Sequence, residues 1–352
     1  MPNRLCVLVL TFAVLILALF AGPQSAQRIS KGDSAKLYKE FRMRTSAEKK
    51  KELDQQLAHL QGLSEKYKVT ILAAQKKAGF DEQQFELDLG AVSAARDSTA
   101  QQKSSANFHA KYEPIARRVA GAADIDPTAL RHDIVSQLNL GNLRQRPTDF
   151  VGVAEASDQP SPTPTPVPAA SNEPQISRAP FTNAGTIGSD DVRANELSGE
   201  LSVRNDFLFG NSIQKLAFIT KEIEIRPGDQ RVRVSVNFEY VRYLVRAFVL
   251  AGYASAEARV NLRLMEGSHQ LCAEPLSLSR VYAAVVWESF DRGDRPVQLA
   301  CEYERPHPED PATYTMVAEI ESWVGGAGAP ANAYSDIYAF VHDFRVYRLR
   351  AP

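Results

Sequence analysis

Hydrophobic residues between positions 45 and 79 recur at alternating steps of four and three, which predicts one long amphipathic helix. Thr45 and Glu48 have the spacing of a capping box, so the helix is expected to begin there, and Gly79 can take the left-handed conformation that ends it. The pattern favours packing in a helical bundle or, through residues 46–78, a coiled coil between copies of the chain. Its apolar-face positions are Leu53, Leu57, Leu60, Ser64, Tyr67, Ile71, Ala74 and Ala78.

More helices are expected after this one. Asp81 begins a second capping box, and its helix is predicted to form an antiparallel hairpin with the first. Pro114 is expected to begin a new helix or to kink the one before it. Asp126, followed by Pro127, predicts a last helix. We therefore assign residues 27–147 to a helical domain.

A proline-rich stretch follows the helices. Residues 160–168 alternate proline with other residues, which removes backbone donors and favours extended polyproline conformation. Low complexity and few large apolar residues extend the region on compositional grounds. We assign residues 148–197 to a disordered linker, a semi-rigid spacer that is expected to hold the two halves of the chain apart.

From about residue 200 the hydrophobic period changes to two, and β-branched and aromatic residues increase. Eight or so antiparallel strands in residues 198–352 predict a β-sandwich of the jelly-roll type. The expected strands are 213–225, 231–240, 242–250, 258–264, 281–290, 297–304, 313–323 and 336–349. The expected turns are 227–229, 266–267, 292–294, 306–311 and 325–330.

The first 26 residues have the layout of a secretory signal peptide. Arg4 precedes an almost wholly apolar run from Leu5 to Phe20, and Gly22-Pro23 breaks the helix before polar residues begin. The apolar run is shorter than the ~20 residues that a spanning helix usually needs, so cleavage is favoured over retention as a membrane anchor. The protein is therefore expected to be exported, to a periplasmic, cell-surface or extracellular location.

Export changes what the cysteines can do. Removal of residues 1–26 takes Cys6 away and leaves Cys272 and Cys301, both in the predicted sandwich. An oxidising compartment favours a disulfide between them. The alternative is two separately buried thiols.

Composition and motifs exclude several classes of function. A formal net charge of −1 is not that of a nucleic-acid-binding protein with a high pI. No nucleophile elbow, phosphate-binding glycine loop, two-histidine zinc helix or calcium loop is present, and the six histidines are scattered. We therefore expect no cofactor and no metal, and we assign no catalytic residue.

Two pairs of glutamates each share one face of a predicted strand, Glu302 with Glu304 and Glu319 with Glu321. If the two strands were neighbours, the carboxylates could act on a glycosidic bond, as in a secreted carbohydrate-active hydrolase. We favour the solvated face of an antiparallel sheet as their explanation, because outward charged residues are the ordinary consequence of the alternation.

The last third of the chain is rich in aromatic residues, which can stack on sugars or anchor a protein partner. Trp323 ends the strand that carries Glu319 and Glu321 and is expected to be exposed. The candidate ligand-binding residues are Trp323, Glu319, Glu321, Gly325, Gly326 and Tyr334.

These features favour an exported, non-enzymatic protein whose helical domain holds a β-sandwich that binds a carbohydrate, a cell-envelope component or a protein. Two alternatives stay open: the hydrolase, and a structural envelope protein tethered by an uncleaved signal. Membrane association is expected only if the signal is retained, and nucleic acid is not an expected partner.

Overall fold

The computed structural model describes residues 33–94, 98–126, 129–130, 132, 174–188, 191–207, 213–249, 252–285, 287–327 and 331–350. The helices are α2 (Asp33–Ala78), α3 (Glu82–Ala94) and α4 (Ser98–Ala122). The strands are β1 (Gln175–Ser177), β2 (Asn183–Ile187), β3 (Val192–Asn195), β4 (Glu200–Phe207), β5 (Ile213–Ile225), β6 (Asp229–Val249), β7 (Tyr253–Glu266), β8 (His269–Ala284), β9 (Trp287–Glu304), β10 (Ala312–Ala327) and β11 (Ala331–Arg350).

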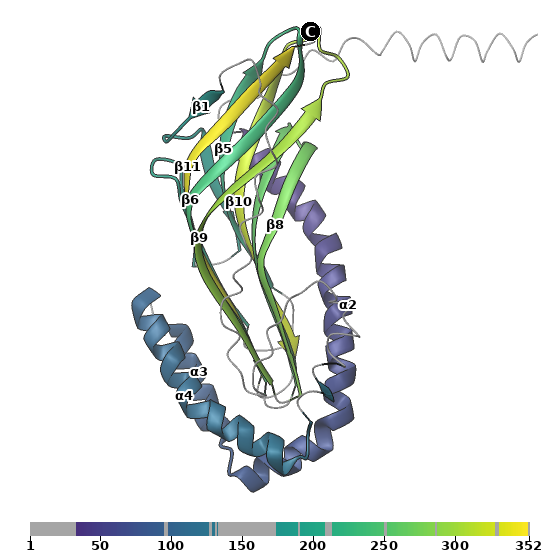
Figure 1. Ribbon diagram of the computed structural model, residues 1–352, viewed down its shortest axis with the longest axis vertical. Coiled ribbons are helices and arrows are strands. Elements are labelled where there is room, and N and C mark those ends of the chain that lie inside the picture. The colour runs from purple at the N-terminus through teal and green to yellow at the C-terminus, as the bar shows by residue number, and fades with distance from the viewer. Residues whose placement is uncertain are drawn as a thin grey trace, which may run out of the picture.

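The strands form two antiparallel sheets that face each other (Figure 1). Sheet A has the order β3-β4-β11-β6-β9, with β1 also paired to β11, and sheet B has the order β2-β5-β10-β7-β8. The two-sheet architecture agrees with the predicted β-sandwich, whereas its jelly-roll type stays a prediction. The strands are long, and β6 alone spans 21 residues.

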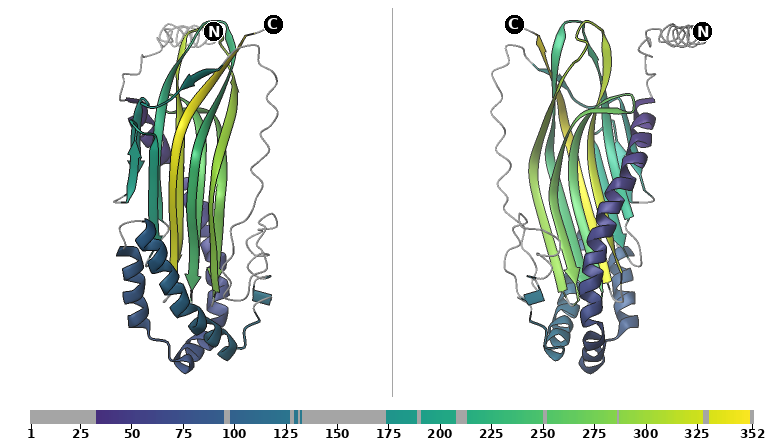
Figure 2. Two further views of the ribbon diagram at one scale, coloured as in Figure 1. Left: turned by 60° about the vertical axis from the view of Figure 1, so that its left-hand side comes forward. Right: turned by 90° about the vertical axis from the view of Figure 1, so that its right-hand side faces the viewer.

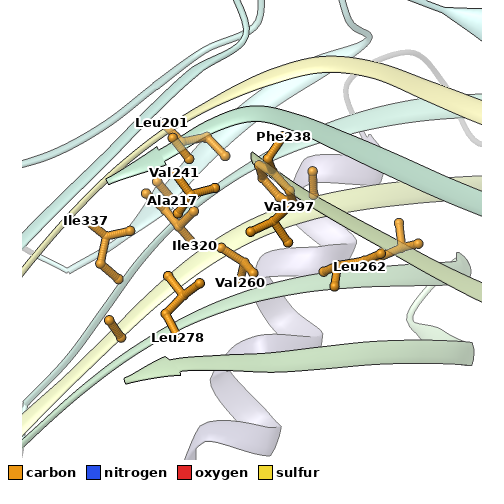
Figure 3. Packing of buried hydrophobic residues seen from close by; sticks show 14 of the residues in the cluster. Leu201, Ala217, Phe238, Val241, Val260, Leu262, Leu278, Val297, Ile320 and Ile337 are labelled. Atoms are coloured by element: carbon orange, nitrogen blue, oxygen red, sulfur yellow. The ribbon is translucent and has the colours of Figure 1, made fainter. Parts of the chain in front are cut away.

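The core lies between the sheets and follows the period of two. Val241 and Ile337 of sheet A and Val260 and Ile320 of sheet B are fully buried, and their side chains lie in one apolar cluster (Figure 3). Phe238 is also buried, although it lies three positions before Val241 and a regular strand would place residues an odd number of positions apart on opposite faces. A bulge between these two residues shifts the alternation, so the predicted strands 231–240 and 242–250 are one continuous strand.

A disulfide joins the two sheets at one edge. Cys272 of β8, in sheet B, is bonded to Cys301 of β9, in sheet A. The bridge predicted from the cysteine count is therefore confirmed.

Helix α2 lies along the outer face of sheet B, and α3 and α4 lie on the opposite side, at one end of the sandwich (Figures 1 and 2). Trp323 and Tyr282 on the outer face of sheet B, and Phe248 on the outer face of sheet A, belong to one apolar cluster with α2, α3 and α4. The rings of Phe85 in α3 and Phe248 are stacked 5.8 Å apart. The expectation of two halves held apart is therefore wrong, because the apolar face of the helices packs on the outer faces of the sheets.

The long helix α2 begins at Asp33 rather than at Thr45. Thr45 lies inside the helix, where its hydroxyl donates to the carbonyl oxygen of Phe41 at 3.2 Å. The additional turns carry Tyr38 and Phe41, which pack on sheet B, so tertiary contacts extend the helix past its local cap signal. The predicted end is confirmed, since Gly79 has a φ of 70°.

The start of the second helix is also confirmed. Asp81 caps α3 by accepting a hydrogen bond from the amide of Gln84 at 3.0 Å. The helix packs against α4 rather than back along α2, so the predicted hairpin partner was wrong (Figure 2). Helix α4 continues through Pro114. Most of the helix expected after Asp126 lies outside the described residues.

The predicted linker, 148–197, is too long at its C-terminal end, because strands β1, β2 and β3 lie within it. These strands are short and pair at the margins of the sheets through backbone hydrogen bonds, which need few large apolar side chains. The prolines at 160–168 lie outside the described residues.

The turn expected at 292–294 is absent, because Gly293 lies within β9. A Cβ at this position would come within 2.6 Å of the Tyr243 ring on the neighbouring strand β6. The glycine therefore makes room for an aromatic side chain rather than for a turn.

Candidate functional site

Three of the predicted ligand-binding residues lie together on the outer face of β10. The indole nitrogen of Trp323 donates to Glu321 Oε1 at 2.6 Å, and Glu319 follows on the same face. Their exposed fractions are only 2% for Trp323, 3% for Glu321 and 0% for Glu319, because α2 covers them. The expectation that Trp323 is exposed was therefore wrong.

Helix α2 places a guanidinium between the two carboxylates. Arg42 Nε lies 3.0 Å from Glu319 Oε2, and Arg42 Nη2 lies 2.5 Å from Glu321 Oε1. The hydroxyl of Tyr38 donates to Glu319 Oε2 at 2.6 Å, and the amide of Asn261 on β7 donates to Glu319 Oε1 at 2.6 Å. We call Tyr38, Arg42, Asn261, Glu319 and Glu321 the α2 ion cluster.

The α2 ion cluster keeps Glu321 ionised. Burial by itself would raise the pKa of Glu321, but the charges of Arg42 and Arg259, with hydrogen bonds from Trp323 and Gln214, lower that pKa to about 2. A general acid in glycoside hydrolysis needs a raised pKa instead. Glu321 therefore has the electrostatics of a buried ion-pair partner rather than those of a general acid.

The remaining candidates lie elsewhere. Glu302 and Glu304 are on β9 in sheet A, whereas β10 is in sheet B, so the four glutamates do not form one patch. Gly325 and Gly326 extend β10 by pairing with β7, and a Cβ at 326 would collide with the carbonyl oxygen of Tyr253. Tyr334 is on the outer face of sheet A. The predicted residues therefore occupy opposite faces of the sandwich.

A pocket of about 830 Å³, which the sequence analysis missed, opens on the outer face of sheet A and along its β3 edge. Strand pairing brings its charged residues together, because Asp336 of β11 lies opposite Arg204 of β4, and Tyr338 lies opposite Arg242 of β6. The lining is formed by Thr186, residues 191–196, Glu200, Leu201, Ser202, Arg204, Arg242, Asp336 and Tyr338.

Half-buried aromatic rings border this pocket. The hydroxyl of Tyr338 donates to Glu200 Oε1 at 2.9 Å, which fixes the ring. The Tyr240 ring lies 6.0 Å away in an edge-to-face arrangement, and the Arg242 guanidinium lies 5.9 Å from the Tyr338 centroid. The pocket therefore combines a positioned ring with a planar cation.

Asp336 is the carboxyl of this group that lies opposite Arg204. Burial raises its pKa above the ordinary value, although the charges of Arg204 and Arg242 act in the opposite direction. Asp191 also contributes to the rise. Perturbation of this kind in a concave site is typical of functional carboxyls.

The sequence contains one signal that could have found this site. Outward positions on β11 read Tyr334, Asp336, Tyr338 and Phe340, whereas the residues between them are small or apolar and buried. An outward series of aromatic and acidic residues is unusual for a simple solvated face. Strand β4, which supplies Arg204, was not among the expected strands.

Among the residues that the structure describes, no group of three or more His, Cys, Asp or Glu side chains could hold a metal ion. Within the same residues, no helix has the length and apolar character that crossing a membrane requires.

No family model matches the sequence, and no curated protein matches it. Solved structures with some similarity include the carbohydrate-binding module TmCBM61 in complex with β-1,4-galactotriose, at 11% identity and a TM-score of 0.18, covering 50% of this chain and 88% of that one. A tailspike protein 4 domain of bacteriophage CBA120 has 15% identity and a TM-score of 0.17, covering 45% of this chain and 19% of that one. A structure of infectious bursal disease virus, Gx strain, has 9% identity and a TM-score of 0.18, covering 47% and 38%.

Proposed function

We propose that the protein is an exported carbohydrate-binding protein that takes its ligand on the outer face of sheet A. The observation that carries this proposal is the pocket in which the half-buried Tyr338 ring stands beside Arg204, Arg242 and Asp336. Sugars present apolar C–H faces that pack on aromatic rings, and hydroxyl groups that bind charged planar side chains in pairs.

The mixture of charges favours a sugar over other ligands. The guanidiniums of Arg204 and Arg242 are matched by Asp336 and Glu200 within the same pocket, so the lining has no excess of positive charge to bind a phosphate. Few large apolar side chains line the pocket, which disfavours a purely apolar ligand. A polar, nearly neutral ligand with a flat apolar face fits the lining.

Long paired strands hold the pocket in place. Tyr338 and Asp336 stand on β11, which is paired with both β4 and β6, so neither side chain depends on a flexible loop. Trp323, Glu319 and Glu321 could contact a ligand only if α2 left sheet B, and we leave them out of the proposed site. Tyr334 lies on the same face as Asp336, but it is only 6% exposed and does not line the pocket, so we leave it out as well.

Export is a proposal rather than a finding, because the predicted signal, residues 1–26, lies outside the described residues. The bond between Cys272 and Cys301 supports it, since disulfides persist in oxidising compartments. The finer sites of export, periplasmic, cell-surface or extracellular, are all compatible with this bond.

The test is calorimetric titration of the full chain with a panel of neutral, amino and acidic oligosaccharides. We expect saturable binding by at least one class, and Tyr338→Ala to weaken it about tenfold, which corresponds to ~1.4 kcal/mol. Tyr338→Phe keeps the ring and should retain most of the affinity. Tyr67→Ala, which removes a half-buried tyrosine on α2, is the matched control and should bind like the unmodified protein. Absence of binding across the panel, or full affinity in Tyr338→Ala, would refute the proposal.

A further inference from the structure

We infer that the ligand is a linear polysaccharide that lies along β11, with the pocket as only one of its contacts; this inference rests on the proposed function. The reason is that a second group of side chains on the same strand repeats the accessible arginine and tyrosine of the pocket. We call Asp336, Tyr338 and Arg242 the lower station, and Asp343, Arg345 and Tyr347 the upper station.

Both stations face outward from sheet A. On β11 the side chains of Ile337, Phe344 and Val346 are buried in the core between the sheets. Because successive residues of a strand point to opposite faces, the residues between them lie on the outer face. Bulges between Phe340 and Asp343 keep this alternation in register with the core in both halves of the strand.

The upper station is as ordered as the lower one. Asp343 accepts a hydrogen bond from Asn237 at 2.6 Å and one from Arg345 Nε at 3.0 Å. A hydrogen bond joins Arg345 to Tyr347 and contributes to the raised pKa of Arg345, with the bond to Asp343 as the larger cause. Asp343 is only 1% exposed and holds Arg345 in place, so the upper station presents an arginine and a half-buried tyrosine to a ligand, as Arg242 and Tyr338 do in the lower station.

The distance between the stations selects a polymer. At ~3.3 Å per residue, the strand from Tyr338 to Tyr347 spans about 30 Å, several times the size of one sugar ring. Phe340 and Tyr240 are paired across β11 and β6 between the two stations and are both half-buried, so aromatic surface continues along the path. A single sugar would fill the lower station and leave the upper one empty.

Among the described residues, a helix bounds the path at one end. Phe108 of α4 lies over the outer face, with the Arg246 guanidinium 4.7 Å from its ring and the Phe248 ring 5.9 Å away. This contact closes the face below the lower station. Above it, the described helices leave β11 uncovered (Figure 2, left). A chain can therefore extend from the pocket towards the upper station.

The experiment compares dimers and hexamers of several sugar classes, namely cello-, malto-, xylo- and chito-oligosaccharides, by titration of the full chain. In the class that binds, we expect the hexamer to bind at least tenfold more tightly than the dimer. Tyr347→Ala should lower hexamer affinity to that of the dimer and leave the dimer unchanged, whereas Tyr338→Ala should weaken both. Tyr347→Phe keeps the ring and should keep most of the preference for the hexamer.

Two outcomes separate the inference from the proposal on which it rests. Equal affinity of dimer and hexamer would overturn the polymer path and leave the carbohydrate site in place. No binding by any class would remove the proposed function and the inference together. Arg345→Gln provides a second variant if Tyr347→Ala does not fold, and its expected effect is the same selective loss of hexamer affinity.

Discussion

The outer faces of the two sheets carry the same kinds of residues and are used in different ways. On sheet B, Arg42 enters between Glu319 and Glu321, and the group is sealed beneath α2. On sheet A, Arg204 and Arg242 stand beside Asp336 in a pocket that no described helix covers. Residue type does not separate a buried contact from a candidate ligand site; what packs on the face does.

The carboxyl groups of the two faces also differ in the direction of their pKa shifts. The pKa of Glu321 is lowered to about 2 against its burial because four partners favour the charged form. The pKa of Asp336 is raised because its partners do not compensate fully for burial. A carboxylate whose partners leave its pKa raised is suited to a ligand, whereas one whose partners lower its pKa strongly is suited to holding a helix.

Apolar contacts and charges play different parts in holding α2 on sheet B. Tyr38 and Phe41 pack on an apolar patch at one side of the α2 ion cluster, and Leu53 and Leu57 lie in the apolar cluster at the other side. Burying apolar surface stabilises the contact, while a buried ion pair contributes little net stability after its desolvation cost. We therefore interpret the α2 ion cluster as the feature that fixes where along sheet B the helix lies.

Removing the arginine should have the largest effect. Arg42→Ala leaves Glu319 and Glu321 buried without their cation, and we expect it to lower the free energy of unfolding by about 3–5 kcal/mol. Urea denaturation followed by circular dichroism measures this loss. Lys50→Ala, which removes an exposed helix pair with Asp54, is the control and should cost about 0.5 kcal/mol or less. A loss below ~1 kcal/mol in Arg42→Ala would mean that the cluster does not hold α2.

Acid should weaken the same contact. Because the pKa of Glu321 is about 2 in the folded protein and 4.5 without its partners, its ionised form stabilises the fold above pH 4.5. That contribution, on the order of 3 kcal/mol, is lost as the pH falls from 4.5 towards 2. Urea titrations at several pH values should show a smaller acid-dependent loss in Glu321→Gln.

The control for this pH dependence is on the other sheet. Glu302→Gln removes a partly exposed carboxylate that lies 3.5 Å from Arg231. Its acid profile should match that of the unmodified protein, because exposed ion pairs shift stability little. An identical profile in Glu321→Gln would instead assign the acid sensitivity to other carboxyls.

The sequence was informative where local chemistry decides structure. Gly79 and Asp81 mark the junction of α2 and α3, and the alternation of valines in β6 gives one buried face. The packing of α2 on sheet B was not predictable. The apolar face of the helix, which includes Leu57, shows that it packs on an apolar surface but not which one. Trp323 was expected to be exposed for the same reason: its strand position fixes a face, and only tertiary packing decides whether that face meets water.

The variant with the smallest expected effect on stability, Asp336→Asn, compares the two faces most directly. Asp336→Asn removes a carboxyl whose pKa is raised by burial, so the folded form already disfavours the charge and the variant should unfold at the same or a higher urea concentration. Ionisation of Asp336 costs stability as the pH rises through its unfolded pKa, which is the opposite sign to Glu321. Its affinity for the sugar should nevertheless fall about tenfold or more, because hydrogen bonds to a charged acceptor contribute ~1.5–3 kcal/mol. In the unmodified protein the same affinity should fall as acid protonates Asp336. Glu321→Gln should behave in reverse, losing stability and keeping affinity for the sugar. If Asp336→Asn also loses stability and keeps affinity, both faces serve the fold alone.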